Sequence, residues 1–345
     1  MRAWTVTQTG LALDPHRPAP SLATAAAAAV TGNDLLLRVR YAGLNPADLA
    51  LMATIPSWLP WRRNPIAGLD FVGEVLAAGP STPASVAKPG TLVCGALGVR
   101  QVFFGAGTLA EVLVVPADLV AAVPQSLLGE PRAAVGLGVT GQTAALVLRE
   151  AEAEGVGRVR RWKGVRVLVN GASGGVGSVL VQVLKARGAY VVGVCSGGEC
   201  GDVTQVIDYT SHRDLYGYIA ESAQDHSLDL VVDCVGDSDL YTRSPGYLRP
   251  DGRFLSIVGG PSQGIYPFLM HQIRPVILGG TPRSYKILGM GPSGTGAREV
   301  AGWIEKGDLK EVIVDSEFTM DEVTTAYERV ASKRAKGKVV VRMGE

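Results

Sequence analysis

The stretch VLVNGASGGVGSVLVQVLKARGA, residues 167–189, decides the fold. It starts as a run of apolar strand formers, passes through a glycine-rich turn, and continues as a run with helical spacing. Gly171, Gly174 and Gly177 are spaced three apart, and a second strand-like run, AYVVGVC, follows. This strand–helix–strand context predicts a dinucleotide site, because backbone N–H groups and the positive end of the helix can approach a pyrophosphate. A tight turn without a ligand is the alternative.

The end of the second strand indicates which dinucleotide is bound. A site for NAD usually places an Asp or Glu there, where it accepts hydrogen bonds from the ribose hydroxyls. This chain has Cys195 at that point, followed by Ser196 and Gly197, with Glu199 close by. A carboxylate would repel a 2′-phosphate, whereas a serine and nearby amides can donate to one. The sequence therefore favours NADPH over NADH.

The length of 345 residues suits two domains. Up to about residue 125, short β-like pieces alternate with Pro and Gly turns, which predicts a mostly β domain. From about residue 165, near-continuous Val/Ile/Leu runs alternate with helical segments, which is typical of a parallel sheet buried on both faces. Its last expected strand is PVILGG, residues 275–280. Near the end of the chain, Thr319 or Asp321 is expected to cap a helix before a final strand from Lys338 to Met343.

The charges argue against nucleic acid and membrane partners. Thirty-three basic and 32 acidic residues are scattered along the chain, with a net charge of +1. The chain has no apolar run near the roughly 20 residues of a membrane span, and no signal pattern. We expect a cytoplasmic protein with a small-molecule substrate. Its dispersed cysteines are interpreted as buried, reduced thiols: Cys94, Cys195, Cys200 and Cys234.

Seven motifs carry a family resemblance over essentially the whole chain. They are YAGLNPADLALM, GLDFVGEVLAAG, GTLAEVLVVPADLVAAVP, LGVTGQTAALVL, VLVNGASGGVGS, LVVDCVG and AKGKVVV. In this order they resemble the medium-chain dehydrogenase/reductase superfamily, and more closely its zinc-free quinone oxidoreductase branch, which includes trans-acting enoyl reductases of fungal polyketide synthesis. The resemblance implies an α/β protein with a GroES-like β domain, residues 1–125 completed by 297–345, and a doubly wound Rossmann domain, residues 126–296.

The resemblance also implies a role for individual residues. Thr140 would lie near the nicotinamide, and Lys338 would approach the cofactor from the C-terminal tail. The remaining contacts would be Ser173, Gly174, Gly175 and Val176 at the pyrophosphate, Ser196 and Tyr209 at the adenosine ribose phosphate, Val235 and Gly236 at the ribose, and Val258 and Gly259 at the nicotinamide edge. For each of these residues the alternative is core packing or a turn. Tyr209 is equally well explained as a half-exposed aromatic at a strand end.

No zinc site is expected. The metal-dependent branch has a cysteine after its first turn and a His-Glu pair in a later segment, which together form a tetrahedral site. This chain has Leu44 and Asn45 at the first place, and Leu69 and Asp70 at the second. The four-cysteine structural lobe is absent as well. The histidines are interpreted as surface residues: His16, His212, His226 and His271.

Without a metal, the scaffold predicts hydride transfer from NADPH to a quinone or an activated C=C bond of an enone or enoyl thioester. Asn45 is the candidate catalytic residue, with bracing of the following turn as its alternative role. Asp48 is interpreted as a helix cap. The segment IPSWLPWRRNP is expected to form a substrate-side loop, in which Trp58 and Trp61 offer apolar area and Arg62 and Arg63 meet an anionic handle such as phosphopantetheine. Packed tryptophans and solvated arginines are the alternative.

The proton donor, the oligomeric state and the reaction class are the last three points on which the sequence bears. Relatives place a proton donor at positions that here hold Ile55 and Ala50, neither of which can donate, so protonation would fall to water or a substrate-side group. The segment RPVILGG resembles the edge strand through which relatives form dimers, which predicts a homodimer. Two other classes stay open: a redox-silent NADPH-binding scaffold, and a biosynthetic enzyme with a non-redox step such as a cyclisation.

Overall fold

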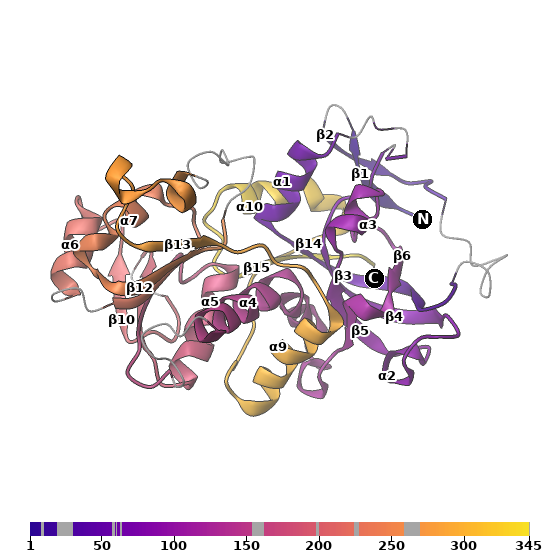
Figure 1. Cartoon of the computed structure of the whole chain (residues 1–345). Coiled ribbons are helices and arrows are strands. Elements are labelled where there is room, and N and C mark those ends of the chain that lie inside the picture. Colours follow the sequence, from indigo (N-terminus) through magenta and orange to yellow (C-terminus); the bar gives the residue numbers. More distant parts are fainter. Residues whose placement is uncertain are drawn as a thin grey trace. The chain divides into compact units, whose positions relative to one another are not determined.

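The computed structural model forms two compact units (Figure 1). It describes residues 1–7, 10–18, 30–56, 59, 61–62, 64–153, 162–197, 200–223, 228–258 and 270–344. The first unit comprises Met1–Gln142, Gly291–Glu305 and Glu311–Glu345, and the second comprises Thr143–Met290 and Lys306–Lys310. The first unit extends past residue 125, because the 3-10 helix η3 (Pro131–Leu137) is buried over most of its length and contacts its sheet.

The first unit is built on a seven-stranded sheet in the order β14-β15-β3-β4-β5-β7, with β6 also paired to β3. The strands are β14 (Val314–Thr319), β15 (Lys338–Arg342), β3 (Asp34–Leu44), β4 (Asp70–Ala78), β5 (Leu92–Ala96), β7 (Val120–Ala122) and β6 (Val112–Pro116), and a separate hairpin joins β1 (Ala3–Thr7) to β2 (Gly10–Asp14). Strand β15 from the end of the chain thus pairs with β3 from its beginning. The β domain is completed by the C-terminal tail.

The first unit also contains several helices. They are α1 (Pro46–Thr54), α2 (Ala84–Ala87), α3 (Val99–Phe103), the start of α4 (Val139–Ala153), most of α9 (Gly294–Lys306), α10 (Val323–Ala331) and the 3-10 helices η1 (Ala117–Leu119), η2 (Gln125–Leu127) and η8 (Met320–Glu322). Of these, α2 and α10 contact the sheet. Thr319 forms a capping box with Glu322 at the start of η8, which confirms Thr319 as the predicted cap. Buried Leu35, Phe71 and Tyr327 belong to the same apolar core.

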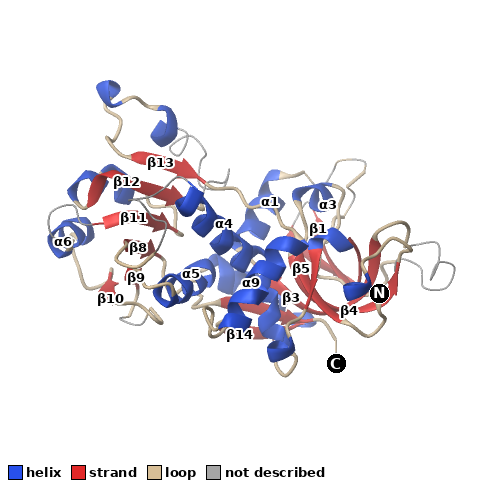
Figure 2. Ribbon diagram, turned by 60° about the horizontal axis from the view of Figure 1, so that its bottom comes forward, coloured by secondary structure: helices blue, strands red, loops and turns tan. Residues whose placement is uncertain are grey.

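The second unit contains six parallel strands in the order β10-β9-β8-β11-β12-β13, and Figure 2 shows β13 at one edge. The strands are β8 (Arg166–Asn170), β9 (Tyr190–Cys195), β10 (Gln205–Asp208), β11 (Leu228–Asp233), β12 (Leu248–Ser256) and β13 (Ser284–Ile287), and the helices are α5 (Gly175–Ala186), α6 (Leu215–Ser222), α7 (Ser238–Thr242), η5 (Ser244–Gly246) and η7 (Val276–Leu278). Chain order runs outward from β8 to both edges, which is the predicted doubly wound arrangement. Nucleotides bind such sheets where the order reverses, here between β8 and β11.

Two sequence-based expectations about this unit are wrong. The segment PVILGG is not a strand, since Val276–Leu278 forms η7 and the sixth strand is β13. Pro275 precedes this turn and Gly279 ends it at a φ of 84°, so the run cannot continue as an extended chain. Its side chains face outward, with Ile277 exposed to 92%. The apolar composition of this run predicted a buried strand, but the run pairs with no strand and is exposed.

The cysteines are the second correction. Cys195 and Cys200 form a disulfide, whereas Cys94 and Cys234 are free thiols. The sequence spacing of five residues is unlike a redox motif, but Cys195 ends β9 and its Cα atom lies 5.9 Å from that of Cys200. No helix of the described residues is long and apolar enough to span a membrane.

Candidate active site and nucleotide-binding turn

Three neighbouring strands of the first unit bring a polar cluster to one end of its sheet. In the β15–β3 pairing Val339 lies opposite Leu44, so Lys338 arrives beside Asn45. In the β3–β4 pairing Gly43 lies opposite Asp70. The register of the three strands therefore brings Asn45, Asp70 and Lys338 together, although they are far apart in the sequence. We call Asn45, Asp70, Thr140 and Lys338 the lysine cluster.

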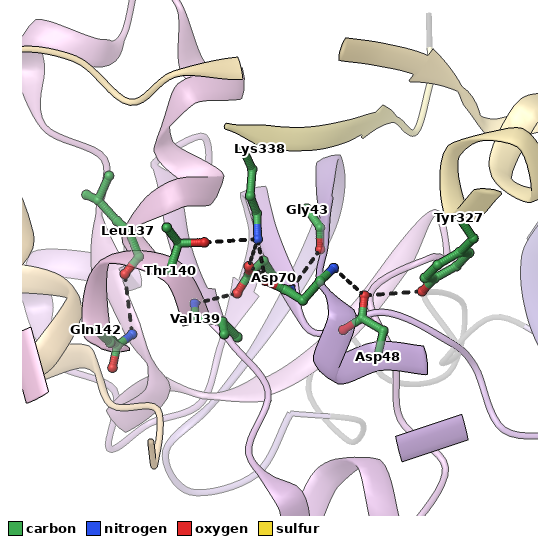
Figure 3. A network of polar contacts seen from close by, with 10 residues as sticks. Gly43, Asp48, Asp70, Leu137, Val139, Thr140, Gln142, Tyr327 and Lys338 are labelled. Carbon is green, nitrogen blue, oxygen red and sulfur yellow. Dashed lines mark hydrogen bonds and ion pairs between the residues drawn. The ribbon is translucent and has the colours of Figure 1, made fainter. Parts of the chain in front are cut away.

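The Lys338 ammonium is the centre of this cluster (Figure 3). It donates to Asn45 Oδ1 at 2.6 Å, to Asp70 Oδ2 at 2.5 Å and to Thr140 Oγ1 at 3.3 Å. The Lys338 side chain is 3% exposed and that of Asp70 is fully buried. A buried ammonium is tolerated only when it is paired and hydrogen-bonded, and here all three of its N–H groups have an acceptor.

Asp70 also links the cluster to helix α4. Its Oδ1 accepts the Val139 N–H at 2.7 Å, at the first residue of α4, where a carboxylate also interacts favourably with the helix dipole. Its Oδ2 accepts Asn45 Nδ2 at 3.0 Å in addition to the lysine. Asn45 Nδ2 makes a further, longer contact with Gly43 O at 3.4 Å. The orientation of the Asn45 amide is therefore fixed by partners on both sides.

Asp48 lies next to the cluster and has an unusual environment. Its Oδ2 accepts the Asn45 backbone N–H at 3.0 Å, which confirms the predicted capping role in α1, and the Tyr327 hydroxyl at 3.3 Å. Its Oδ1 is buried without a partner among the described residues. Burial, together with the nearby charge of Asp70, raises the pKa of Asp48 from 3.8 to about 7, against the lowering effect of the Asn45 N–H, of Lys338 and of Tyr327. Burial also raises the pKa of Tyr327 well above 10.0.

The glycine-rich turn of the second unit has the geometry that its sequence predicts. Gly171 adopts a φ of 78°, and a Cβ at Gly177 would lie 2.2 Å from the Gly171 carbonyl, so both positions require glycine for the turn and for close packing of strand and helix. Gly174 is the N-cap of α5 with an ordinary negative φ, and a Cβ there would make only a tight 3.3 Å contact. The first N–H groups of α5 have no acceptor within the helix.

Asn170 and Asp233 mark the point where the strand order reverses. They end β8 and β11, and Asn170 Nδ2 donates to Asp233 Oδ1 at 3.0 Å. Asp233 also accepts the backbone N–H groups of Val235, Gly236 and Asp237. Burial raises the pKa of Asp233, although these hydrogen bonds act in the opposite direction. Asp233 therefore shapes the loop that carries Val235 and Gly236. The sequence analysis did not single it out, but a carboxylate ending an apolar strand run in LVVDCVG was the available signal.

The predicted ribose-phosphate residues directly follow two neighbouring strands, Ser196 after β9 and Tyr209 after β10. Ser196 is half-buried directly after Cys195, and Gly197 N donates to Asp208 Oδ2 at 3.2 Å. Tyr209 is bonded through its backbone N–H to Cys195 O and is 48% exposed. No carboxylate ends β9 itself, but Asp208, at the end of β10, brings one beside the loop. Asp208 was not among the residues predicted from the sequence.

The predicted site residues therefore fall into separate groups. Asn45, Thr140 and Lys338 meet in the lysine cluster of the first unit. The other predicted contacts that the structure describes belong to the second unit: Ser173, Gly174, Gly175 and Val176 in the glycine-rich turn, Ser196 and Tyr209 after β9 and β10, Val235 and Gly236 after β11, and Val258 after β12. Gly259 lies outside the described residues. Val258 O accepts the Ser256 hydroxyl at 3.0 Å.

The expected substrate-side loop, residues 55–65, is only partly described, since Trp58 and Arg63 lie outside the described residues. Arg62 is 2% exposed and its guanidinium donates to the carbonyls of Ile55, Pro56 and Val102. It is therefore neither solvated nor available for an anionic handle, and both interpretations are wrong for this residue. Trp61 is half exposed and its ring centroid lies 5.9 Å from that of Phe103.

The histidines lie in various surroundings. His16 is exposed, and His212 stacks on Tyr218 with ring centroids 3.7 Å apart. His271 is half-buried, and its Nε2 lies 3.2 Å from Ser238 Oγ. His226 lies outside the described residues. None of these three described histidines contacts the lysine cluster.

A β domain made from both chain ends, with a doubly wound sheet between its parts, defines the class of two-domain nucleotide-dependent dehydrogenases. The comparisons agree. A family described as alcohol dehydrogenase GroES-like domain matches residues 31–125, and one described as zinc-binding dehydrogenase matches residues 202–341. The medium chain reductase pydE of an Acremonium species is 35% identical over 339 residues, 90% of each chain. The trans-enoyl reductase poxH of Penicillium oxalicum is 32% identical and covers 100% of this chain and 98% of its own.

Two solved structures share the fold. The quinone oxidoreductase of Coxiella burnetii has a TM-score of 0.77 at 22% identity and covers 99% of both chains. That of Thermus thermophilus, also solved in complex with NADPH, has a TM-score of 0.71 at 24% identity and covers 99% of this chain and 100% of its own. The chain belongs to the medium-chain dehydrogenase/reductase superfamily and to its zinc-free branch, as the sequence motifs predict.

The described residues do not fit a zinc ion, although one matching family is described as zinc-binding. They contain no group of three or more His, Cys, Asp or Glu side chains that could hold a metal. At the two places where the metal-dependent branch has its ligands, this chain offers Asn45 and Asp70, and both already contact the Lys338 ammonium. The Lys338 ammonium thus occupies the position beside Asn45 and Asp70 where a zinc ion would have to bind.

Proposed function

We propose that the protein is an NADPH-dependent reductase that transfers hydride to a quinone or an activated C=C bond. The observation that carries the proposal is the position of Gly174 at the N-terminus of α5. The turn itself requires Gly171 and Gly177 but leaves Gly174 unexplained. Close approach of a phosphate to the backbone explains it, because any side chain there would stand in front of the unpaired helix N–H groups.

Bound NADPH supplies the hydride, and the chain's own residues bind and orient it. The α5 N-terminus with Ser173, Gly174, Gly175 and Val176 holds the pyrophosphate. Val235 and Gly236, on the loop that Asp233 shapes, would contact the ribose side, and Val258 would contact the nicotinamide edge. Thr140 would face the nicotinamide end of the cofactor, with Asn45 beside it in the lysine cluster.

The preference for NADPH rests on the end of β9. Cys195 there carries no negative charge, and Ser196 and the adjacent amides can donate to a 2′-phosphate. Asp208 opposes this preference, because its carboxylate accepts the Gly197 N–H and would repel a phosphate. We therefore expect Asp208→Asn to tighten NADPH binding and leave NADH binding unchanged, measured by calorimetry on both cofactors. Equal dissociation constants of the unmodified protein for the two cofactors would contradict the preference.

The substrate class follows from the relatives and from what the site lacks. Of the proteins named above, poxH is by name a trans-enoyl reductase and two are quinone oxidoreductases. In this chain the expected position of a proton donor holds Ile55, whose side chain packs against the apolar core. We propose that protonation falls to water or to a substrate-side group. Quinones and highly activated enones would then be better substrates than simple enoyl thioesters. An Ile55→Tyr variant should stay active and gain turnover on enoyl thioesters.

The test is the decay of NADPH absorbance with a panel of quinones, enones and enoyl thioesters. Oxidation of NADPH by at least one class supports the proposal. A protein that binds NADPH but oxidises it with none of them would instead be the redox-silent scaffold or the non-redox enzyme.

We also propose that the protein is a homodimer in the cytoplasm. The edge strand β13 is adjacent in sequence to an exposed apolar segment comprising Ile273, Val276, Ile277 and Leu278. An open edge beside such a segment favours association with a second copy. Light scattering at micromolar concentration tests this, and a strict monomer would contradict it.

A further inference from the structure

The hydrogen bonds of the lysine cluster leave one donor uncommitted. All three Lys338 N–H groups have acceptors, and the Asn45 amide donates to Asp70 and Gly43. The Thr140 hydroxyl accepts from Lys338, and its own O–H has no acceptor among the described residues. A hydroxyl whose lone pair is held by an ammonium must direct its hydrogen elsewhere. Thr140 is therefore the group in the cluster that can donate to a ligand.

The backbone around the cluster is shaped to admit the ion pair. A Cβ at Gly43 would lie 2.7 Å from Lys338 Cε, and a Cβ at Gly138 would lie 2.2 Å from Asp70 Oδ1. Neither glycine has a positive φ. They are explained by the space that the buried lysine and aspartate side chains occupy. The glycines at positions 43 and 138 therefore both leave room for the ion pair between Lys338 and Asp70.

Electrostatics gives the lysine a second effect on Thr140. An ammonium that donates to a hydroxyl oxygen draws electron density from it, which makes the O–H a stronger donor. Asp70 balances the charge of Lys338 and also holds Val139, the neighbour of Thr140, at the start of α4. The lysine and the aspartate thereby fix both the backbone and the hydroxyl of Thr140.

We propose that Lys338 is a positioning residue that orients the Thr140 hydroxyl to donate to an oxygen of the nicotinamide end of bound NADPH, rather than a residue that contacts the cofactor itself. This deepens the proposed function and rests on NADPH being the ligand. A direct contact would require Lys338 to break at least one of its three hydrogen bonds inside the buried cluster. Orientation through Thr140 requires none to break.

The test is a set of NADPH dissociation constants, which need no turnover. Thr140→Val should weaken binding about tenfold, the effect of one lost hydrogen bond to a ligand, and Thr140→Ser should restore it. Lys338 is removed together with its counter-charge in the double variant Lys338→Met/Asp70→Asn, because a buried Asp70 without a counter-charge would strongly destabilise the protein. This double variant should also lose about tenfold, and adding Thr140→Val to it should cost nothing more.

Two further variants make the result decisive. Lys338→Arg keeps the charge, but its planar guanidinium cannot direct three N–H bonds from one nitrogen, so it should weaken binding as the double variant does. If the double variant does not fold, Lys338→Arg alone tests the role of the lysine. Lys336→Met is the matched control, since Lys336 is an exposed lysine on the same tail, and it should bind NADPH like the unmodified protein.

The possible outcomes distinguish the role of Lys338 from the proposed function. Additive losses for Thr140→Val and the double variant, a Lys338→Arg variant that binds normally, or a Thr140→Val variant with an unchanged dissociation constant would overturn the inference. If the variants show the expected dissociation constants but the unmodified protein reduces no acceptor, only the proposed reductase function is overturned. A protein that does not bind NADPH would overturn both.

Discussion

Replacing Asp48 with asparagine should change how the stability of the protein depends on pH. Asp48 is a fully buried carboxyl whose pKa rises from 3.8 to about 7 in the folded protein. A raised pKa means that the folded state holds the proton more tightly than the unfolded state. The resulting stability is fully present below pH 3.8 and is lost as the pH rises towards 7.

The magnitude follows from the size of the shift. A change of about 3 pKa units corresponds to about 4 kcal/mol, and roughly 3 kcal/mol of this is lost between about pH 5 and pH 8. Asparagine is uncharged and keeps an acceptor for the Asn45 N–H and the Tyr327 hydroxyl, so it imitates the protonated acid at every pH. The free energy of unfolding of Asp48→Asn minus that of the unmodified protein should therefore increase by about 3 kcal/mol over this range.

Urea unfolding at several pH values measures this difference, and the subtraction cancels every other titrating group. Asp118→Asn is the matched control, since Asp118 is exposed, and its difference from the unmodified protein should stay constant with pH. A difference for Asp48→Asn that is flat, or that decreases as the pH rises, would show that the carboxyl is ionised in the folded protein throughout. Burial would then not keep Asp48 protonated in the folded protein.

Three other outcomes can be checked directly. Purified protein should carry no stoichiometric zinc, and elemental analysis finding one equivalent on which activity depends would contradict the assignment of Asn45 and Asp70 to the lysine. Ser173→Asp should abolish NADPH binding in calorimetry while leaving the melting temperature nearly unchanged, because it places a negative charge against the pyrophosphate; retained binding would move the pyrophosphate elsewhere. Thiol titration of the denatured, unreduced protein should count two free cysteines, Cys94 and Cys234, and four after reduction, whereas four at the outset would show that Cys195 and Cys200 are not bonded.

The sequence predicted the fold well where two independent signals coincided. The run before Gly171 has strand composition and also precedes a turn that only glycine can form, and β8, the turn and α5 are found there. PVILGG carried a single signal, apolar composition, and that signal cannot distinguish a buried strand from an exposed turn. The disulfide could not be predicted from the sequence, because it depends on where the fold places Cys200 relative to the end of β9.

The candidate site was predicted as individual residues but not as an arrangement. Asn45, Thr140 and Lys338 were each named, yet nothing in the sequence shows that the Lys338 ammonium binds the other two. Asp70 was noted only as a departure from a zinc ligand. Its role became visible when β4 placed it opposite Gly43. The contacts of Asp70 depend on pairing between strands that are far apart in the sequence, and hydrophobic periodicity does not predict such pairing.

The same pairing makes the lysine cluster a consequence of completing the sheet. Lys338 reaches Asp70 only if β15 pairs with β3 in the observed register, because a shift by one residue would turn every side chain of β15 to the opposite face. The wrong register would leave Asp70 buried without a counter-charge, which costs several kcal/mol. The ion pair therefore favours the correct docking of the C-terminal strand, and the residue that orients Thr140 is in place only when the β domain has closed.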